Sequence, residues 1–190
     1  KSMPNWCLNT IELAHKDSTM IQRAKTALQE GKFLNEFMPV PEDLQIVAGR
    51  VGSDDSQEQK DLVAKEEANK AKYGHANWYD WCISNWGTKW DVDADMVESK
   101  DDNSLSASFQ SAWSPPVPFY EELEALGFSV RALYYEPGMA FAGWYEDGVD
   151  DFYEYGGMTS EQVANELPGL LDEAFGISEE IAQYEEEEQE

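Results

Sequence analysis

The segment TKWDVDADMVESKDDNSLSASFQSAW, Thr88–Trp113, predicts a β-hairpin in the middle of the chain. Apolar and polar residues alternate in both of its arms, and KDDN (100–103) supplies a polar tip, as expected for a strand–turn–strand unit. The hairpin decides the fold because it lies between two sets of predicted elements. A strand and helices are predicted before it, and a helix and a strand are predicted after it.

The predicted elements before the hairpin begin with a strand at 7–15 (CLNTIELAH), which is rich in apolar and β-branched residues. A helix follows, capped by Asp17 or Ser18 and stopped by Gly31. The other elements on this side are a connecting stretch (33–56), an exposed, charge-rich helix (56–74) and a short helix (77–85).

The elements after the hairpin are a proline-led helix (114–127), a strand (128–138), a second hairpin (139–157) and a last helix (159–176). The last helix opens with a capping box, Thr159 or Ser160 ahead of Glu161 or Gln162, and we expect Pro168 to kink it.

This order predicts an α+β fold with a ferredoxin-like, split β-α-β core. One domain is expected over 3–176, with a helical insertion at about 40–75 and an added C-terminal β-hairpin and closing helix at about 138–176. The acidic tail, 177–190, is expected to be frayed or disordered.

The net charge of −26 is concentrated in the second half of the chain. Residues 1–90 hold eleven Lys/Arg and thirteen Asp/Glu, whereas residues 91–190 hold only Lys100 and Arg131 against twenty-six Asp/Glu. A charge distribution this one-sided creates a negative electrostatic field, which repels nucleic acid and anionic membranes and attracts basic surfaces. Direct binding to nucleic acid or to a membrane is therefore not expected.

The location predicted for the protein is the cytoplasm of a bacterial host. No apolar run reaches the roughly 20 residues that a membrane helix needs, and the signal-peptide pattern is absent. Cys7 and Cys82 are far apart and outside any CxxC motif, so we expect two reduced, buried thiols.

Four tryptophans, Trp78, Trp81, Trp86 and Trp90, lie within thirteen residues. They offer stacking surfaces for a planar ligand, but a nucleic-acid platform also needs a basic groove. Lys89 is the nearby cation, and several aspartates surround it. We therefore expect these four residues to form a structural aromatic core.

The DVDAD segment opens like a calcium loop, but Met96 and Asp102 occupy the positions that need glycine and a bidentate glutamate. Neither His15 nor His75 belongs to a catalytic or zinc motif, and phosphate-binding loops are absent from the sequence. The prediction is a protein without a metal, a cofactor or catalytic residues.

The acidic residues themselves are the remaining candidate site. Alternation in a strand places Asp91, Asp93 and Asp95 on one face. The predicted partner-binding acidic face comprises Asp91, Asp93, Asp95, Glu98, Asp101, Asp102, Glu121, Glu122, Glu146, Asp147, Asp150, Asp151 and Glu154. Alternate strand residues lie roughly 6.6 Å apart, which is comparable with phosphate spacing along DNA.

Four blocks resemble a known family: MPNWCLN near the start, YDWCISNWGTKWD, AWSPPVPF and YYEPGMAFAGW. Over Met3 to about Trp144 the chain is similar to the YubB-type proteins of phages and plasmids, which have a ferredoxin-like domain. The resemblance implies an origin in a mobile genetic element and supports the predicted fold. It implies no activity and no catalytic residues.

The leading hypothesis is a non-enzymatic phage or plasmid protein that inhibits a host nucleic-acid-binding or defence protein by DNA-like charge mimicry. Its partner would be a nuclease, restriction or CRISPR complex with a basic surface. One alternative is an interaction module that uses an aromatic surface, with the acids serving only solubility. A further alternative is a small-ligand or nucleotide-processing enzyme with a pocket beside the tryptophans.

Overall fold

A computed structural model describes residues 3–190 as an α+β protein built on one antiparallel six-stranded sheet. The strands are β1 (Trp6–Ala14), β2 (Ala94–Asp101), β3 (Ser104–Ala112), β4 (Ser129–Glu136), β5 (Phe141–Glu146) and β6 (Val149–Glu154). Their order in the sheet is β2-β3-β1-β4-β5-β6.

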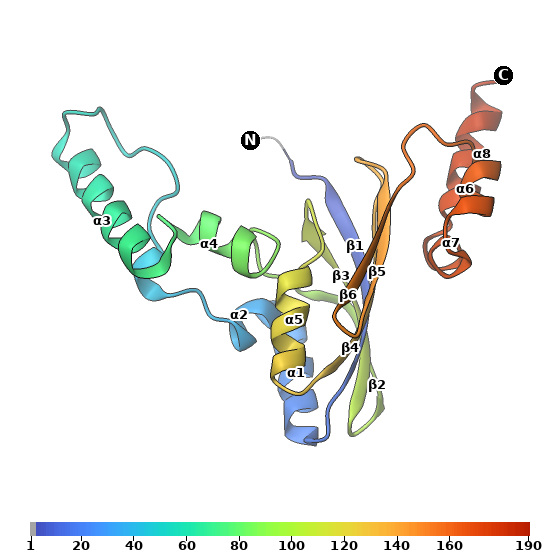
Figure 1. The fold of residues 1–190 in the computed structure, drawn as a ribbon, viewed down its shortest axis with the longest axis horizontal. Helices are drawn as coiled ribbons and strands as arrows, with labels where there is room; N and C mark the ends of the chain where they lie inside the picture. The colour runs from blue at the N-terminus through green and yellow to red at the C-terminus, as the bar shows by residue number, and fades with distance from the viewer. Residues whose placement is uncertain (1–2) are drawn as a thin grey trace.

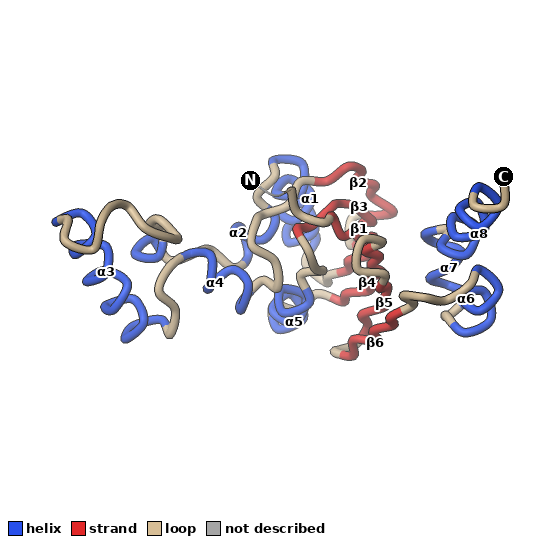
Figure 2. The backbone as a smooth tube through the Cα atoms, turned by 90° about the horizontal axis from the view of Figure 1, so that it is seen from above, coloured by secondary structure: helices blue, strands red, loops and turns tan. Residues whose placement is uncertain are grey.

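The helices lie on both sides of this sheet (Figures 1 and 2). They are α1 (Ser18–Glu30), α2 (Phe33–Phe37), the 3-10 turn η1 (Glu42–Leu44), α3 (Gln57–Tyr73), α4 (Trp78–Asn85), α5 (Val117–Ala125), α6 (Ser160–Glu166), α7 (Gly169–Phe175) and α8 (Ile177–Glu187). Helices α1 and α5 cover the first face, and α6–α8 lie across the second face. Helix α3 projects to the end of the molecule opposite α8.

The first four strands confirm the predicted split β-α-β core. The β1-α1-β2 unit is split by β3, and the β3-α5-β4 unit is split by β1. The inserted helical segment between α1 and β2 is longer than predicted, because α2 and α4 belong to it as well as η1 and α3. No helix among residues 3–190 is long and apolar enough to cross a membrane.

Local capping explains why several helices end where the sequence predicts. The Asp17 carboxylate accepts the N–H of Thr19 at the start of α1, and Gly31 ends this helix with a left-handed φ of 73°. The Thr159–Gln162 capping box starts α6 as expected. Pro168 separates two helices, α6 and α7, whereas the sequence predicts a kink within one helix.

Two hydrophobic cores form, one on each face of the sheet. In β1, Cys7, Ile11 and Leu13 face α1 and α5, while the alternate residues face the other side. The second core lies between β4–β5 and α6–α8; its buried members are Tyr135, Ala142, Tyr155, Val163, Leu167, Leu171 and Ile177.

The prediction of a disordered tail after residue 176 is wrong. Residues 177–187 form α8, which places Ile177 in the second core without exposed surface. Glu180 accepts the hydroxyl of Tyr135 at 2.8 Å, and Glu185 accepts the N–H and hydroxyl of Ser160. The composition of this segment alone indicates disorder. Apolar residues spaced four positions apart, and the hydrogen bonds accepted by Glu180 and Glu185, hold it in place as a helix.

Replacement of Ile177 by alanine is therefore expected to lower the free energy of unfolding by about 2–5 kcal/mol, the usual range for a buried isoleucine. Urea denaturation measures this change. The matched control is Gln183→Ala on the exposed side of α8, for which we expect a change within about 0.5 kcal/mol. Equal stability of the two variants would mean that α8 does not belong to the core.

Candidate functional site

The two acidic hairpins lie at opposite edges of the sheet. Strand β2 is one edge and β6 is the other, with β3, β1, β4 and β5 between them. Neighbouring strands are separated by about 4.8 Å, so the two edges are roughly 24 Å apart. The thirteen predicted residues therefore do not form a single acidic face.

Asp91 is a structural residue, so its assignment to an exposed acidic row is wrong. Strand β2 begins only at Ala94, and the Asp91 carboxylate accepts the backbone N–H groups of Leu34 (2.8 Å) and Asn35 (2.9 Å) in α2. Burial raises the pKa of this carboxyl group, while these hydrogen bonds oppose the rise. The carboxylate of Asp91 therefore binds backbone groups within the protein and is not presented to a partner.

The other acidic residues around β2 are exposed, but they do not alternate along one face. Asp93 precedes the strand, and Asp95 lies at a register shift between Ala94 and Met96. Asp101 accepts the N–H of Asn103 and therefore shapes the hairpin turn. Glu98 and Asp102 are exposed at the edge strand and at its turn.

The remaining predicted acids are divided between several environments. Glu121 and Glu122 belong to α5 on the first side of the sheet. Asp150 accepts the hydroxyl of Tyr134 at 2.6 Å; burial, and after it this hydrogen bond, raises the pKa of Tyr134. Exposed positions on β6 and its turn are Asp147, Asp151 and Glu154.

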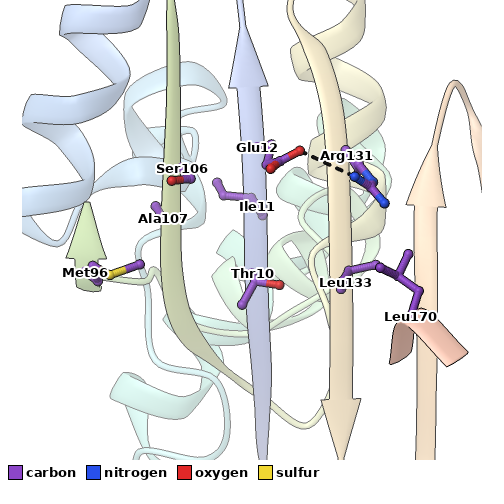
Figure 3. A pocket seen from close by; sticks show the side chains of 9 residues that line it. All are labelled: Thr10, Ile11, Glu12, Met96, Ser106, Ala107, Arg131, Leu133 and Leu170. Atoms are coloured by element: carbon purple, nitrogen blue, oxygen red, sulfur yellow. Dashed lines mark ion pairs between the residues drawn. The ribbon is translucent and has the colours of Figure 1, made fainter. Parts of the chain in front are cut away.

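A groove of about 250 Å³ crosses the part of the second face that α6–α8 leave open (Figure 3). Inside it, the Arg131 guanidinium lies 3.7 Å from Glu12 and 3.9 Å from Glu146. Lys100 binds the same Glu12 at 2.9 Å, and this hydrogen bond lowers the pKa of Glu12. The centre of this face is thus neutralised by two cations.

The tryptophan block is partly a core, as predicted. Trp86 is 4% exposed, its indole N–H donates to the Met38 carbonyl at 2.8 Å, and its ring contacts that of Trp81 edge-on. Trp78 and Trp81 pack partly buried against the first core. Trp90 is 42% exposed, so its assignment to the core is wrong. The chain turns away after Gly87, which has a φ of 91°.

Exposed aromatic and apolar side chains gather instead at the end of the sheet near α4. We name as the aromatic surface five residues that are each 38–43% exposed: Trp6, Tyr79, Ile83, Trp90 and Trp113. The rings of Trp6 and Trp90 are 6.2 Å apart, and Lys89 Nζ lies 4.1 Å from the Trp90 ring centroid. A depression of about 420 Å³ opens between Tyr79, Ile83 and Trp113.

Trp113 holds a backbone conformation that a bulky residue rarely adopts. Its φ is +70°, in the left-handed region that favours glycine. The conformation is fixed by the Trp113 N–H, which donates to the Asn5 carbonyl at 2.8 Å. Strain of this kind persists where the surrounding structure enforces it, and it concentrates at functional sites.

The hydroxyl groups at the floor of the depression already donate hydrogen bonds within the protein. The Thr88 hydroxyl donates to the Ala112 carbonyl, and the Ser114 hydroxyl donates to the Gly87 carbonyl. A Cβ on Gly87 would lie 2.7 Å from Pro118 Cδ, so the close packing of this turn requires glycine.

Trp6 and Trp113 belong to this surface although neither is predicted from the sequence as part of a site. The signal for Trp6 was available, because it alternates with Cys7, Ile11 and Leu13 and therefore belongs to the opposite side of β1. No comparable signal existed for Trp113, since its φ depends on the contact with Asn5.

Neither cysteine offers a reactive thiol. Both are free and buried, and burial raises the pKa of Cys7 and of Cys82 to about 12, so both stay protonated at neutral pH. Within residues 3–190, no group of three His, Cys, Asp or Glu side chains is placed to hold a metal ion.

No family model and no curated protein match this chain. A crystal structure of the protein api92 from Yersinia pseudotuberculosis, which carries the family model DUF1281, is similar to it with a TM-score of 0.43 and 14% identity. The similarity covers 81% of this chain and 99% of that protein. This likeness is too distant to assign a function.

The internal role of Asp91 leads to a stability prediction. Asp91→Ala leaves the N–H groups of Leu34 and Asn35 without their acceptor, so we expect the free energy of unfolding to fall by about 1–3 kcal/mol. Asp95→Ala, at an exposed position, is expected to change it by less than about 0.5 kcal/mol. Urea denaturation at pH 7 compares the two, and an unchanged stability of Asp91→Ala would contradict the capping role.

Proposed function

We propose that this chain is a non-enzymatic binding protein that engages a partner protein through the aromatic surface. The observation that carries this proposal is the exposure of Tyr79, Ile83 and Trp113 around one depression. The exposed pair Trp6 and Trp90 extends this surface, because Lys89 lines the depression and lies over the Trp90 ring. A contiguous exposed apolar patch marks an interaction site, and tryptophan and tyrosine dominate the binding energy of protein interfaces.

A protein partner fits this surface better than a nucleic acid does. Stacking platforms for single-stranded nucleic acid need a basic groove, whereas this molecule has a net charge of −26 and one lysine, Lys89, among the residues that line the depression. The acidic second half then keeps the protein soluble and repels nucleic acid.

The decisive variant is Trp113→Gly, which removes the ring and places at φ +70° the residue that tolerates this conformation best. The fold is therefore expected to persist. A partner isolated from a bacterial host, the setting that the YubB-type resemblance suggests, is expected to bind the variant about 30-fold more weakly, as at an interface hot spot. Biolayer interferometry with the purified partner measures the dissociation constant.

The matched control for this experiment is Tyr184→Ala, an exposed aromatic residue on α8 that is distant from the aromatic surface. It is expected to bind the partner like the wild type. Wild-type affinity of Trp113→Gly, or an equal loss in both variants, would refute a contact through the aromatic surface.

A second candidate function follows from the charge distribution. Residues 132–190 contain seventeen Asp/Glu and no Lys, Arg or His. Of these seventeen acidic residues, only Glu146 takes part in an ion pair within residues 3–190. This acidity favours a host nucleic-acid-binding or defence protein as the partner, reached by charge attraction. The acidic region would then be the second hairpin, β5 and β6, together with α6–α8, without the first hairpin.

Charge reversal separates this second candidate from the first. Glu186, Glu187 and Glu188 on and after α8 are exposed, as are Asp55, Glu58 and Asp61 at the α3 end of the molecule. If charge attraction drives the association, replacing Glu186, Glu187 and Glu188 by lysine is expected to lower the association rate constant at least about tenfold. Electrostatic steering by a local field raises association rates by at least that factor. The same net change at the second set has a smaller effect.

Salt provides the second arm of this test. The Debye length falls from about 10 Å at 0.1 M to about 3 Å at 1 M salt, so a charge-led association slows across this range. Stopped-flow mixing with the partner measures the rate constant. Insensitivity to salt and to the α8 reversal, together with loss of binding in Trp113→Gly, would exclude charge-led binding in favour of the aromatic surface.

A further inference from the structure

We infer that the depression between Tyr79, Ile83 and Trp113 receives an aromatic side chain that is flanked by a carboxylate on the partner protein. This inference rests on the proposed function and names the chemistry that the same surface would recognise. It is carried by the juxtaposition of apolar walls, a saturated floor and one cation at the rim.

The walls of the depression suit a flat ring. Tyr79 and Ile83 lie one turn apart on α4, and Trp113 follows β3 on the opposite side. Their half-exposed side chains enclose about 420 Å³, which is within the usual range of ligand pockets of about 300–1,000 Å³. Aromatic rings pack against such side chains in offset or edge-to-face contact.

The floor selects against a polar insert. Thr88 and Ser114 direct their hydroxyl protons to the carbonyls of Ala112 and Gly87, at 2.9 and 2.5 Å. A polar group placed in the depression would lose its hydrogen bonds to water without gaining these donors. The inserted part of the partner is therefore apolar.

Lys89 defines what flanks this ring. Its ammonium group lies over the face of Trp90, and among residues 3–190 no carboxylate lies within ion-pair distance of it. The field of the whole molecule is negative, so a polyanion such as a nucleic acid is repelled. A single carboxylate beside the ring pairs with Lys89 and brings only one negative charge, so it avoids the repulsion that a polyanion meets.

Two synthetic octapeptides test this chemistry with the full chain. They differ only in the residue that follows a central phenylalanine, which is aspartate in one and asparagine in the other. Isothermal titration is expected to show the aspartate peptide binding the wild type about threefold to fivefold more tightly, the gain typical of an exposed ion pair. In Lys89→Gln this ratio is expected to fall to about one, with the asparagine peptide unaffected.

Two further variants complete the design. Trp113→Gly is expected to weaken both peptides about tenfold, because the aromatic wall is lost. Lys65→Gln on α3, which removes an exposed lysine that does not line the depression, is expected to leave the preference for aspartate intact.

The outcomes distinguish this inference from the proposed function. Equal binding of the two peptides, a preference that survives in Lys89→Gln, or no binding of either peptide overturns the inference. Partner binding that still depends on Trp113 would in those cases leave the proposed function standing. Partner binding that is indifferent to Trp113 overturns the proposed function whatever the peptides show.

Discussion

Burial on both faces of one antiparallel sheet is the constraint on which the rest of this structure depends. On the first face, α1 and α5 cover all four strands of the split β-α-β core. On the second face, α6–α8 cover β4 and β5 and leave β2, β3 and β1 open. This unequal cover leaves a neutralised groove beside the C-terminal helices.

Local signals were sufficient to predict most of the fold. Asp17 and Gly31 bound α1, Thr159 and Gln162 start α6, and alternation identifies both hairpins, because each of these interactions joins residues close in sequence. The path of α8 was not predictable in the same way. Its composition is that of a solvated tail, and its position depends on contacts with Tyr135 and with Ser160.

The candidate site was predicted less well, for the same physical reason. Whether Asp91 faces solvent depends on the N–H groups of Leu34 and Asn35, which lie 57 and 56 positions earlier. Spacing alone placed it on an exposed row. The aromatic surface likewise joins residues from β1, α4 and the end of β3, and its long-range neighbours decide which tryptophans are covered. Charge and aromatic content were visible in the sequence, but their arrangement was not.

The position of the acidic hairpins also affects how copies of this protein meet. Strands β2 and β6 end the sheet on its two sides, so each presents backbone N–H and C=O groups that have no neighbouring strand. An open edge of this kind invites pairing with another chain and growth into aggregates. Carboxylates at Asp95 and Glu98 on one rim, and at Asp151 and Glu154 on the other, bring like charges together whenever two rims approach. Repulsion between these carboxylates therefore opposes edge-to-edge pairing of two copies of the six-stranded sheet.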